Sequence, residues 1–366
     1  SQPDLNWRNP EVQDAMFDVV RFWLDRGVDG FRLDVAHFIM KDPEMRDNPP
    51  APAANGAFKS MGEYDSQLHP YDKGHSDVHR VFREFRAVLD GYDGDRFSVG
   101  EIHVFDVEEW ALYYGSDLDE LHMPFNFSLV WAPWDARRFR ELVDEIDGAV
   151  PEGGWPNYVL GNHDERRMVG RFGAAQARVA AMLLLTLRGT PTLYYGDELG
   201  LSNVEIPYRD QQDPWALQEP AVESRDGCRT PMPWDGSRTS GFSPSGSTKP
   251  WLPVPEDHRE ANVEVQLEQE KSILNLYRRL LAIRKETPAL LGGSYASLDT
   301  AEGVFAYRRE SPGDSLLVAL NFTDEERVVS SGPGMVVVST ELDRVGPINQ
   351  RLILRPLEGV LLRLTI

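Results

Sequence analysis

The chain has 366 residues and a formal net charge of −21, from 38 Lys and Arg against 59 Asp and Glu. This length exceeds what one core usually serves and predicts two domains. The acidic excess argues against nucleic-acid and anionic-membrane partners and favours a neutral substrate. No apolar run approaches 18 residues, so no membrane span is expected. The single cysteine, Cys228, excludes an intramolecular disulfide and indicates a reducing, cytoplasmic compartment.

The first elements of the chain are a helix and a strand. Asn9 and Pro10 form an N-cap and first-turn pair, and apolar residues at helical spacing predict a helix that stops at Gly27. A strand over 30–35 follows at once. Residues 41–74 are rich in Pro, Asn, Asp and Gly and are expected to form a long loop above the carboxyl end of that strand.

Strands and helices then alternate, which predicts βα units and a parallel sheet. Residues 201–262 are expected to be mostly loop. The further strands are predicted at 97–104, 121–129, 158–160 and 192–195, and the further helices at 79–89, 107–114, 137–146, 174–187 and 272–286.

After Gly292 and Gly293 the periodicity changes to short strands between turn signals, which predicts a small antiparallel β-domain. The two domains are therefore expected at 1–289 and 290–366. The strands of the second are predicted at 304–309, 315–322, 335–339, 351–355 and 359–364.

The strand over 30–35 carries the first chemical signal. Its apolar residues alternate with Arg32 and Asp34, so these two side chains share a face and can touch. The fixed charge of the arginine would keep the carboxylate ionised at neutral pH, as a carboxylate nucleophile requires. A structural ion pair at a strand end is the alternative that these residues leave open.

Three acidic residues, Asp34, Glu101 and Asp164, stand at the ends of predicted strands, where α/β barrels keep their chemistry. Their surroundings resemble the α-amylase superfamily of retaining glycoside hydrolases, and within it the α-glucosidase/oligo-1,6-glucosidase group. The stretches that carry this resemblance are QPDLN at 2–6, GFRLDVAH at 30–37, FSVGEIHV at 97–104, YVLGNHDERR at 158–167, GTPTLYYGDE at 189–198 and CRTPMPWD at 228–235.

The resemblance implies an α/β fold, a (β/α)8 TIM-type barrel followed by a small antiparallel β-sandwich. It implies that Asp34 is the nucleophile, Glu101 the general acid/base and Asp164 a third acid that binds the −1 sugar. Retention requires two carboxyl groups about 5–5.5 Å apart. The acid must also hold its proton near neutral pH, which burial or a neighbouring negative charge achieves. Arg32 is expected to offset the crowding of charge at Asp34.

Further residues follow from the same resemblance. Arg32 and His163 are expected in the −1 subsite, and Arg229 either lines that pocket or stabilises a loop. Val35 stands where the family varies with linkage preference, although a valine is also ordinary packing. His37 either touches a +1 sugar or is a hydrogen-bonded structural histidine. Asp197 and Glu198 are expected to tie loops together.

The resemblance is incomplete. It implies that the five predicted strands correspond to the fourth to eighth strands of the barrel, so that three βα units of the family fold are missing. We therefore expect a C-terminal fragment, a nicked chain or one partner of a split enzyme, with the N-terminal segment as a possible separate chain and little folding or activity alone. No cofactor is predicted, and a calcium site on that segment cannot be judged. Glu165, Arg166 and Arg167 depart from the commoner polar-Pro-Arg pattern.

Three functions remain open at this point. The leading one is a retaining, exo-acting α-glucosidase on short α-glucosides. An α-glucosyl transglycosylase or isomerase, of the trehalose synthase or sucrose isomerase type, would use the same site. A catalytically inactive binding or transporter-associated subunit is the third, and the three acids and the lack of a membrane helix argue against it.

Overall fold

The computed structural model describes residues 3–51, 64, 66–218, 222–244 and 249–365. Gln2 of the first motif and part of the predicted 41–74 loop lie outside the described residues. The chain divides into two compact units: residues 1–128 with 145–158, and residues 129–144 with 159–366. These units do not test the predicted boundary at 289/290, which stays a prediction.

The first unit opens with the predicted helix and strand. Helix α1 (Pro10–Leu24) is capped by Asn9, whose side chain accepts the amide hydrogen of Glu11 at 3.0 Å. Gly27, with φ of 87°, follows the helix, as predicted. Strand β1 (Gly30–Leu33) is shorter than expected. It ends because Val35 adopts the left-handed conformation and starts the 3-10 helix η1 (Ala36–Phe38).

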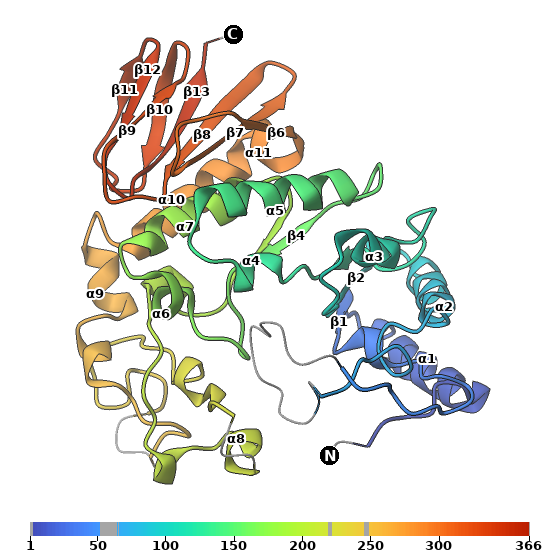
Figure 1. The fold of residues 1–366 in the computed structure, drawn as a ribbon. Helices are drawn as coiled ribbons and strands as arrows, with labels where there is room; N and C mark the ends of the chain where they lie inside the picture. Colours follow the sequence, from blue (N-terminus) through green and yellow to red (C-terminus); the bar gives the residue numbers. More distant parts are fainter. Residues whose placement is uncertain (1–2, 52–63, 65, 219–221, 245–248, 366) are drawn as a thin grey trace. The chain divides into compact units, whose positions relative to one another are not determined.

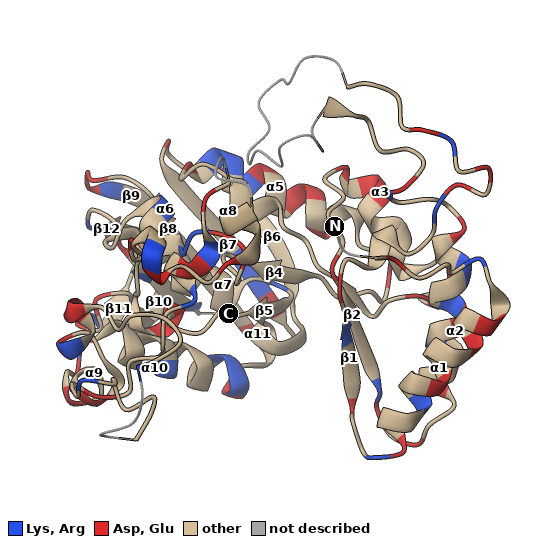
Figure 2. Ribbon diagram, turned by 90° about the horizontal axis from the view of Figure 1, so that it is seen from below, with Lys and Arg blue, Asp and Glu red and all other residues tan. Residues whose placement is uncertain are grey.

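Strand β1 belongs to a three-stranded parallel sheet in the order β1-β2-β3, with β2 (Phe97–Gly100) and β3 (Met123–Pro124). Helix α2 (Val78–Asp90) packs beside α1 (Figure 1, Figure 2). Helix α3 (Val107–Ala111) and the 3-10 helix η3 (Leu112–Tyr114) fill the predicted helix at 107–114. The predicted strand at 121–129 was too long, because α4 (Ser128–Trp131) begins within it.

The second unit holds the buried helix that the sequence predicts. Helix α7 (Gln176–Thr186) has almost every residue buried, and it packs against α10 (Ile273–Glu286). Pro288 closes α10 but also begins α11 (Pro288–Gly292), which was not predicted, because proline suits a first helical turn.

The remaining elements before residue 290 are short, apart from α5. They are α5 (Ala136–Ala149), β4 (Asn157–Val159), α6 (Met168–Phe172), β5 (Thr190–Thr192), α8 (Pro214–Gln218), α9 (Val263–Glu268) and the 3-10 helices η4 (Asp197–Leu199), η5 (Tyr208–Asp210), η6 (Arg225–Cys228) and η7 (Glu256–Arg259). Strands β4 and β5 pair with each other.

The last part of the chain is antiparallel β-structure, as predicted. A six-stranded sheet has the order β11-β10-β13-β8-β7-β6, and β12 pairs with β9. Apolar residues of both sheets, including Leu317, Val329 and Leu352, form one buried cluster. The strands are β6 (Ser294–Leu298), β7 (Val304–Ser311), β8 (Asp314–Asn321), β9 (Arg327–Ser330), β10 (Gly334–Ser339), β11 (Gly346–Ile348), β12 (Arg351–Leu354) and β13 (Gly359–Leu364).

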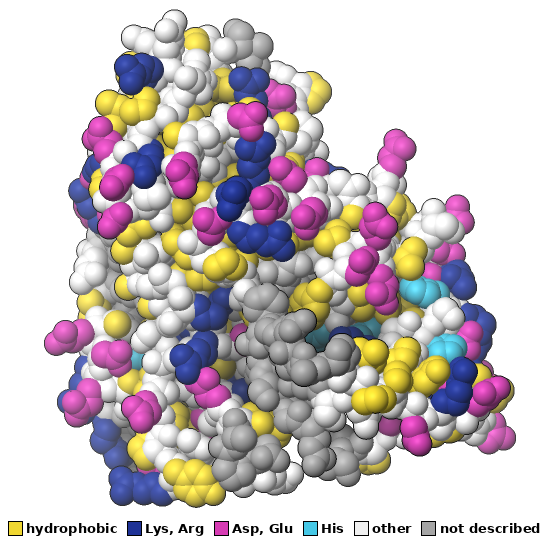
Figure 3. Space-filling view, viewed as in Figure 1, with side chains coloured by type: hydrophobic (Ala, Val, Ile, Leu, Met, Phe, Trp, Pro, Cys, Tyr) yellow, Lys and Arg dark blue, Asp and Glu magenta, His cyan; other side chains and the backbone are white. Residues whose placement is uncertain are grey.

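Acidic and basic side chains are interspersed on the face shown in Figure 3, with no broad patch of one sign. Within the described ranges, no helix combines the length and apolar composition needed to cross a membrane.

Candidate active site

The register of β1 and β2 brings two of the predicted acids together. Leu33 lies opposite Gly100, so Asp34 and Glu101 follow the ends of adjacent parallel strands. The amide of Glu101 donates to the carbonyl of Leu33 at 2.9 Å, and the amide of Ala36 donates to the carbonyl of Glu101 at 3.1 Å. Backbone bonds on both sides therefore fix the spacing of the two residues.

Arg32 joins the two carboxyl groups. Its Nη1 donates to Asp34 Oδ1, and its Nη2 donates to Glu101 Oε2 at 2.7 Å. The ion pair between Arg32 and Asp34 was predicted, and its extension to Glu101 was not. Because two nitrogens of one guanidinium hold them, the carboxyl groups lie close together, as a retaining mechanism requires.

The two acids differ in exposure. The side chain of Asp34 is 74% exposed, and that of Glu101 is 5% exposed.

Between them in the chain, Val35 has a backbone φ of 36°. Such a value is rare for a β-branched residue and is a form of backbone strain found at functional sites. This conformation lets the Val35 amide donate to Glu101 Oε2 at 3.0 Å. The Val35 side chain remains substantially exposed beside Asp34.

The surroundings of Glu101 favour its ionised form. Burial raises its pKa, but hydrogen bonds from His103 and the Val35 amide, with the charge of Arg32, outweigh burial and lower the pKa to about 2. The arrangement of these donors thus favours the carboxylate form, and the expectation that this acid holds its own proton near neutral pH stays a prediction.

His37 is fully buried, and its Nδ1 lies 3.1 Å from the carbonyl oxygen of Glu101. A carbonyl only accepts, so Nδ1 carries the hydrogen. Burial, followed by the charge of Lys73, lowers the pKa of His37 to about 3. Of the two alternatives for His37, this geometry supports the structural one, because the ring orients the Glu101 backbone and does not reach the surface.

His103 was missed as a site residue. Its Nε2 lies 2.8 Å from Glu101 Oε1, and its ring stacks on Phe127 with centroids 4.4 Å apart. A signal was present, because a residue two positions after Glu101 in an extended segment shares its face. The same two-residue spacing relates Arg32 to Asp34 and Glu101 to His103, but only the first pair was predicted.

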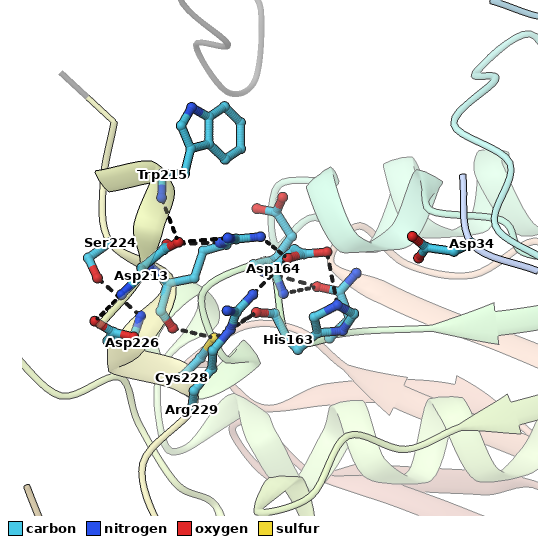
Figure 4. Close-up of polar contacts among 12 residues, drawn as sticks. Asp34, His163, Asp164, Asp213, Trp215, Ser224, Asp226, Cys228 and Arg229 are labelled. Atoms are coloured by element: carbon cyan, nitrogen blue, oxygen red, sulfur yellow. Dashed lines mark hydrogen bonds and ion pairs between the residues drawn. The ribbon is translucent and has the colours of Figure 1, made fainter. Parts of the chain in front are cut away.

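The third acid lies in the second compact unit, where it has its own set of partners (Figure 4). Asp164 follows β4 on a turn closed by Asn162, whose side-chain oxygen accepts the amides of Asp164 and Glu165 at 2.9 Å. Asp164 Oδ1 accepts from Arg229 at 2.9 Å, and its Oδ2 lies 3.3 Å from His163 Nε2. The structure therefore brings His163 and Arg229 together with Asp164.

A second arginine at Asp164 was not predicted. Arg225 donates to Asp164 Oδ1 at 2.8 Å and to both carboxylate oxygens of Asp213, at 2.7 and 2.8 Å. Asp213 is fully buried, and its hydrogen bonds from Arg225 hold its pKa well below the ordinary range. Asp226 in turn accepts the amide of Asp213 at 3.0 Å (Figure 4). The carboxylates of Asp213 and Asp164 thus fix the position of the Arg225 guanidinium, and Asp226 holds the backbone of Asp213.

Cys228 supports the same loop. Its thiol contacts the carbonyl oxygens of Arg225 at 3.1 Å and His163 at 3.5 Å, and burial raises its pKa to about 11. It is a buried structural cysteine in the reduced state.

Asp197 and Glu198 tie their own loop together, as the sequence suggested. Glu198 accepts the Gly196 amide at 2.7 Å, and Asp197 accepts the Tyr194 amide at 3.2 Å.

The unusual sequence after Asp164 has a structural role. Arg167 is buried and donates to the carbonyl of Cys228 at 2.9 Å, while Arg166 binds the exposed Glu223 at 2.8 Å.

No group of three or more His, Cys, Asp or Glu side chains within the described ranges is arranged to hold a metal ion. The expectation that the chain needs no cofactor stays a prediction.

The alpha amylase catalytic domain family matches residues 1–293. A protein of Rhizobium meliloti (strain 1021), named "Probable alpha-glucosidase", is 39% identical over 340 residues, which are 89% of this chain and 60% of that protein. The curated relatives also include oligo-1,6-glucosidases. The chain thus spans about 60% of the length of the relative described.

Solved structures agree with the sequence matches. The alpha-glucosyl transfer enzyme XgtA is 38% identical, with a TM-score of 0.88 over 100% of this chain and 69% of that one. The trehalulose synthase MutB from Pseudomonas mesoacidophila MX-45 is 31% identical, with a TM-score of 0.84 over 99% of this chain and 70% of that one.

These matches confirm the predicted class, a TIM-barrel domain followed by antiparallel β-structure. The assignment of the five strands to the fourth to eighth of a barrel stays a prediction. By its match over most of its length, the chain belongs to the alpha-amylase family, in the group of the alpha-glucosidases and oligo-1,6-glucosidases.

Proposed function

We propose that the protein is a retaining α-glucosidase that releases terminal α-linked glucose from short oligosaccharides and disaccharides. The observation that carries this proposal is the pair of carboxyl groups on adjacent strand ends, Asp34 and Glu101, held by the single guanidinium of Arg32. The similarity to an alpha-glucosidase supports the same reaction. The acidic chain, with its net charge of −21, suits a neutral substrate.

The first step would form a covalent intermediate. Asp34, exposed and paired with Arg32, attacks the anomeric carbon, and the bond from that carbon to the leaving oxygen breaks. The leaving oxygen takes a proton through Glu101, which leaves the alcohol free and the glucose bound as an ester of Asp34. Water then attacks the ester while Glu101 accepts the proton, and glucose departs with its original configuration.

Asp164 is proposed as the acid that binds the same sugar. Two guanidinium groups, those of Arg225 and Arg229, hold its Oδ1, and its Oδ2 lies 3.3 Å from His163 Nε2. The side chains of His163 and Val35 are exposed, and both are proposed to contact substrate.

The alternative function is transfer or isomerisation on the same covalent intermediate. Similarity to an alpha-glucosyl transfer enzyme and to a trehalulose synthase supports it. The two functions differ in whether water or a sugar hydroxyl attacks the ester. Incubation of the complete protein with maltose, isomaltose and sucrose separates them: glucose without new glucosides favours hydrolysis, and new disaccharides favour transfer.

The proposal is tested by Glu101→Gln in the complete protein, with the exposed Glu223→Gln as matched control. We expect Glu101→Gln to reduce kcat on maltose by about 10²–10⁴-fold, the usual contribution of general acid–base catalysis. Added azide should restore turnover of an aryl α-glucoside and yield α-glucosyl azide, because azide attacks the ester of Asp34 with a second inversion. Full activity of Glu101→Gln on maltose would refute the acid/base assignment.

A further inference from the structure

The hydrogen bonds at Glu101 determine which of its oxygens can carry a proton. Oε2 faces two donors, Arg32 Nη2 at 2.7 Å and the Val35 amide at 3.0 Å. Neither a guanidinium nor a backbone amide can accept a hydrogen bond. When Glu101 is neutral, its proton therefore lies on Oε1.

Oε1 has a partner of another kind. His103 Nε2 lies 2.8 Å away, and an imidazole nitrogen can either donate or accept. The His103 ring is held in place by its stacking on Phe127, with a centroid distance of 4.4 Å and an interplanar angle of 5°. The side chain of Glu101 is only 5% exposed, so His103 takes the place that water would have at a surface carboxyl group.

The other charged and titratable groups facing this pair cannot replace His103. Arg32 holds its charge at all relevant pH values, and Asp34 is bound to it. His37 donates through Nδ1 to the Glu101 backbone, and its ring centroid lies 5.8 Å from that of His103. Lys73 acts on His37 by its charge. Of these groups, Arg32 favours the ionised form of Glu101 by its charge.

We propose that Glu101 and His103 share one proton, and that His103 is the positioning residue that stores it for catalysis. This inference rests on the proposed glucosidase function. In the first step, the proton moves from His103 Nε2 to Glu101 Oε1 as Glu101 passes a proton to the leaving oxygen and the glycosidic bond breaks. A neutral imidazole and a carboxylate remain. In the second step, water loses a proton to Glu101, and the pair regains its shared proton.

The sign of a pH shift separates this role from that of a simple hydrogen-bond donor. If His103 stores the proton, its removal leaves Glu101 with Arg32 and the Val35 amide alone, and the alkaline limb of kcat/KM moves to lower pH. If His103 only stabilises the carboxylate, its removal raises the pKa of Glu101, and the alkaline limb moves to higher pH.

The experiment compares His103→Phe and His103→Gln with wild type in the complete protein. His79→Phe is the matched control, because His79 Nδ1 also lies 2.7 Å from a buried glutamate, Glu120, that an arginine binds. Two substrates are used: p-methoxyphenyl α-glucoside, whose leaving group needs a proton, and α-glucosyl fluoride, whose leaving group needs little protonation.

For both His103 variants we expect an alkaline limb at least about one pH unit lower, and a loss of about 10²-fold in kcat/KM at pH 7 on the aryl glucoside. Turnover of α-glucosyl fluoride should stay within a few-fold of wild type, which also reports correct folding. His79→Phe should leave the alkaline limb in place.

An alkaline limb that is unmoved or moves upward in the His103 variants would overturn the shared proton. The proposed function would survive an unmoved or raised alkaline limb, provided that the wild type is active and Glu101→Gln is not. If wild type cleaves neither α-glucoside, the proposed function itself fails.

Discussion

The clusters around Glu101 and Asp164 hold their carboxylates with different kinds of donors. Glu101 Oε1 faces an imidazole nitrogen, which can either donate or accept a hydrogen bond. Asp164 Oδ1 faces two guanidinium groups, which stay charged at every accessible pH. We propose a division of tasks, in which Glu101 takes part in proton transfer and Asp164 binds the sugar without transferring a proton.

Of the effects that compare the two clusters, the largest is expected at Asp164. Asp164→Asn should lower kcat/KM on maltose by about 10²–10³-fold, because the negative charge near the developing positive charge of the sugar is lost. The alkaline limb of the pH profile should stay where it is in wild type, since Asp164 carries no transferred proton. A shifted limb would show that Asp164 belongs to the proton-transfer group as well. Glu223→Gln, with an exposed carboxylate, serves as the control.

The next effect concerns the support of Asp164. Asp213→Asn removes the buried partner of Arg225 and should destabilise the protein by about 3–5 kcal/mol, as the loss of one member of a buried ion pair does. Arg225→Lys keeps the charge but not the two-pronged contact, so it should raise KM more than it lowers kcat. Urea unfolding and steady-state kinetics measure the two. An unchanged unfolding midpoint in Asp213→Asn would contradict this account of the buried ion pair.

These contacts also show what the sequence could predict. The strand-end acids were found because alternation and strand ends are local patterns, and Arg32 and Asp34 are two residues apart. The pairing of Arg225 with Asp213 had no such pattern, because it spans a loop-rich region without periodicity. The contact of Arg32 with Glu101 joins two strands, and sequence spacing does not specify it.

The predicted strand boundaries failed for a related reason. Val35 favours extended structure by propensity, yet it adopts a left-handed conformation that ends β1 and directs its amide at Glu101. Tertiary contacts outweigh the local preference at this position. Val35 was therefore wrongly predicted to continue the strand, and its place in the substrate site stays a prediction.

A smaller effect concerns pH and stability in the second unit. Burial raises the pKa of Asp197 from 3.8 to about 7, and its Oδ1 has no hydrogen-bond partner among the described residues. The folded state then keeps a proton that the unfolded chain releases, so Asp197 lowers stability as pH rises through this window. At about 1.4 kcal/mol per pKa unit, the effect amounts to several kcal/mol. Asp197→Asn should reduce the fall in Tm between pH 5 and pH 8, and an unchanged fall would contradict the raised pKa.

The smallest effect is expected at the surface pair of Arg166 and Glu223. Both side chains are exposed, so Arg166→Gln should change the free energy of unfolding by less than about 1 kcal/mol. Urea unfolding measures it. A larger loss would show that this departure from the family pattern supports the Asp164 loop.

The central claim is that Asp34 is the nucleophile of the pair held by Arg32, and a covalent trap tests it most directly. The complete protein is treated with 5-fluoro-α-glucosyl fluoride, digested and examined by mass spectrometry. This account predicts a fluoroglucosyl ester on the peptide that carries Asp34, and none in Asp34→Asn. An ester on Glu101 or Asp164, or on no residue of an active protein, would contradict it.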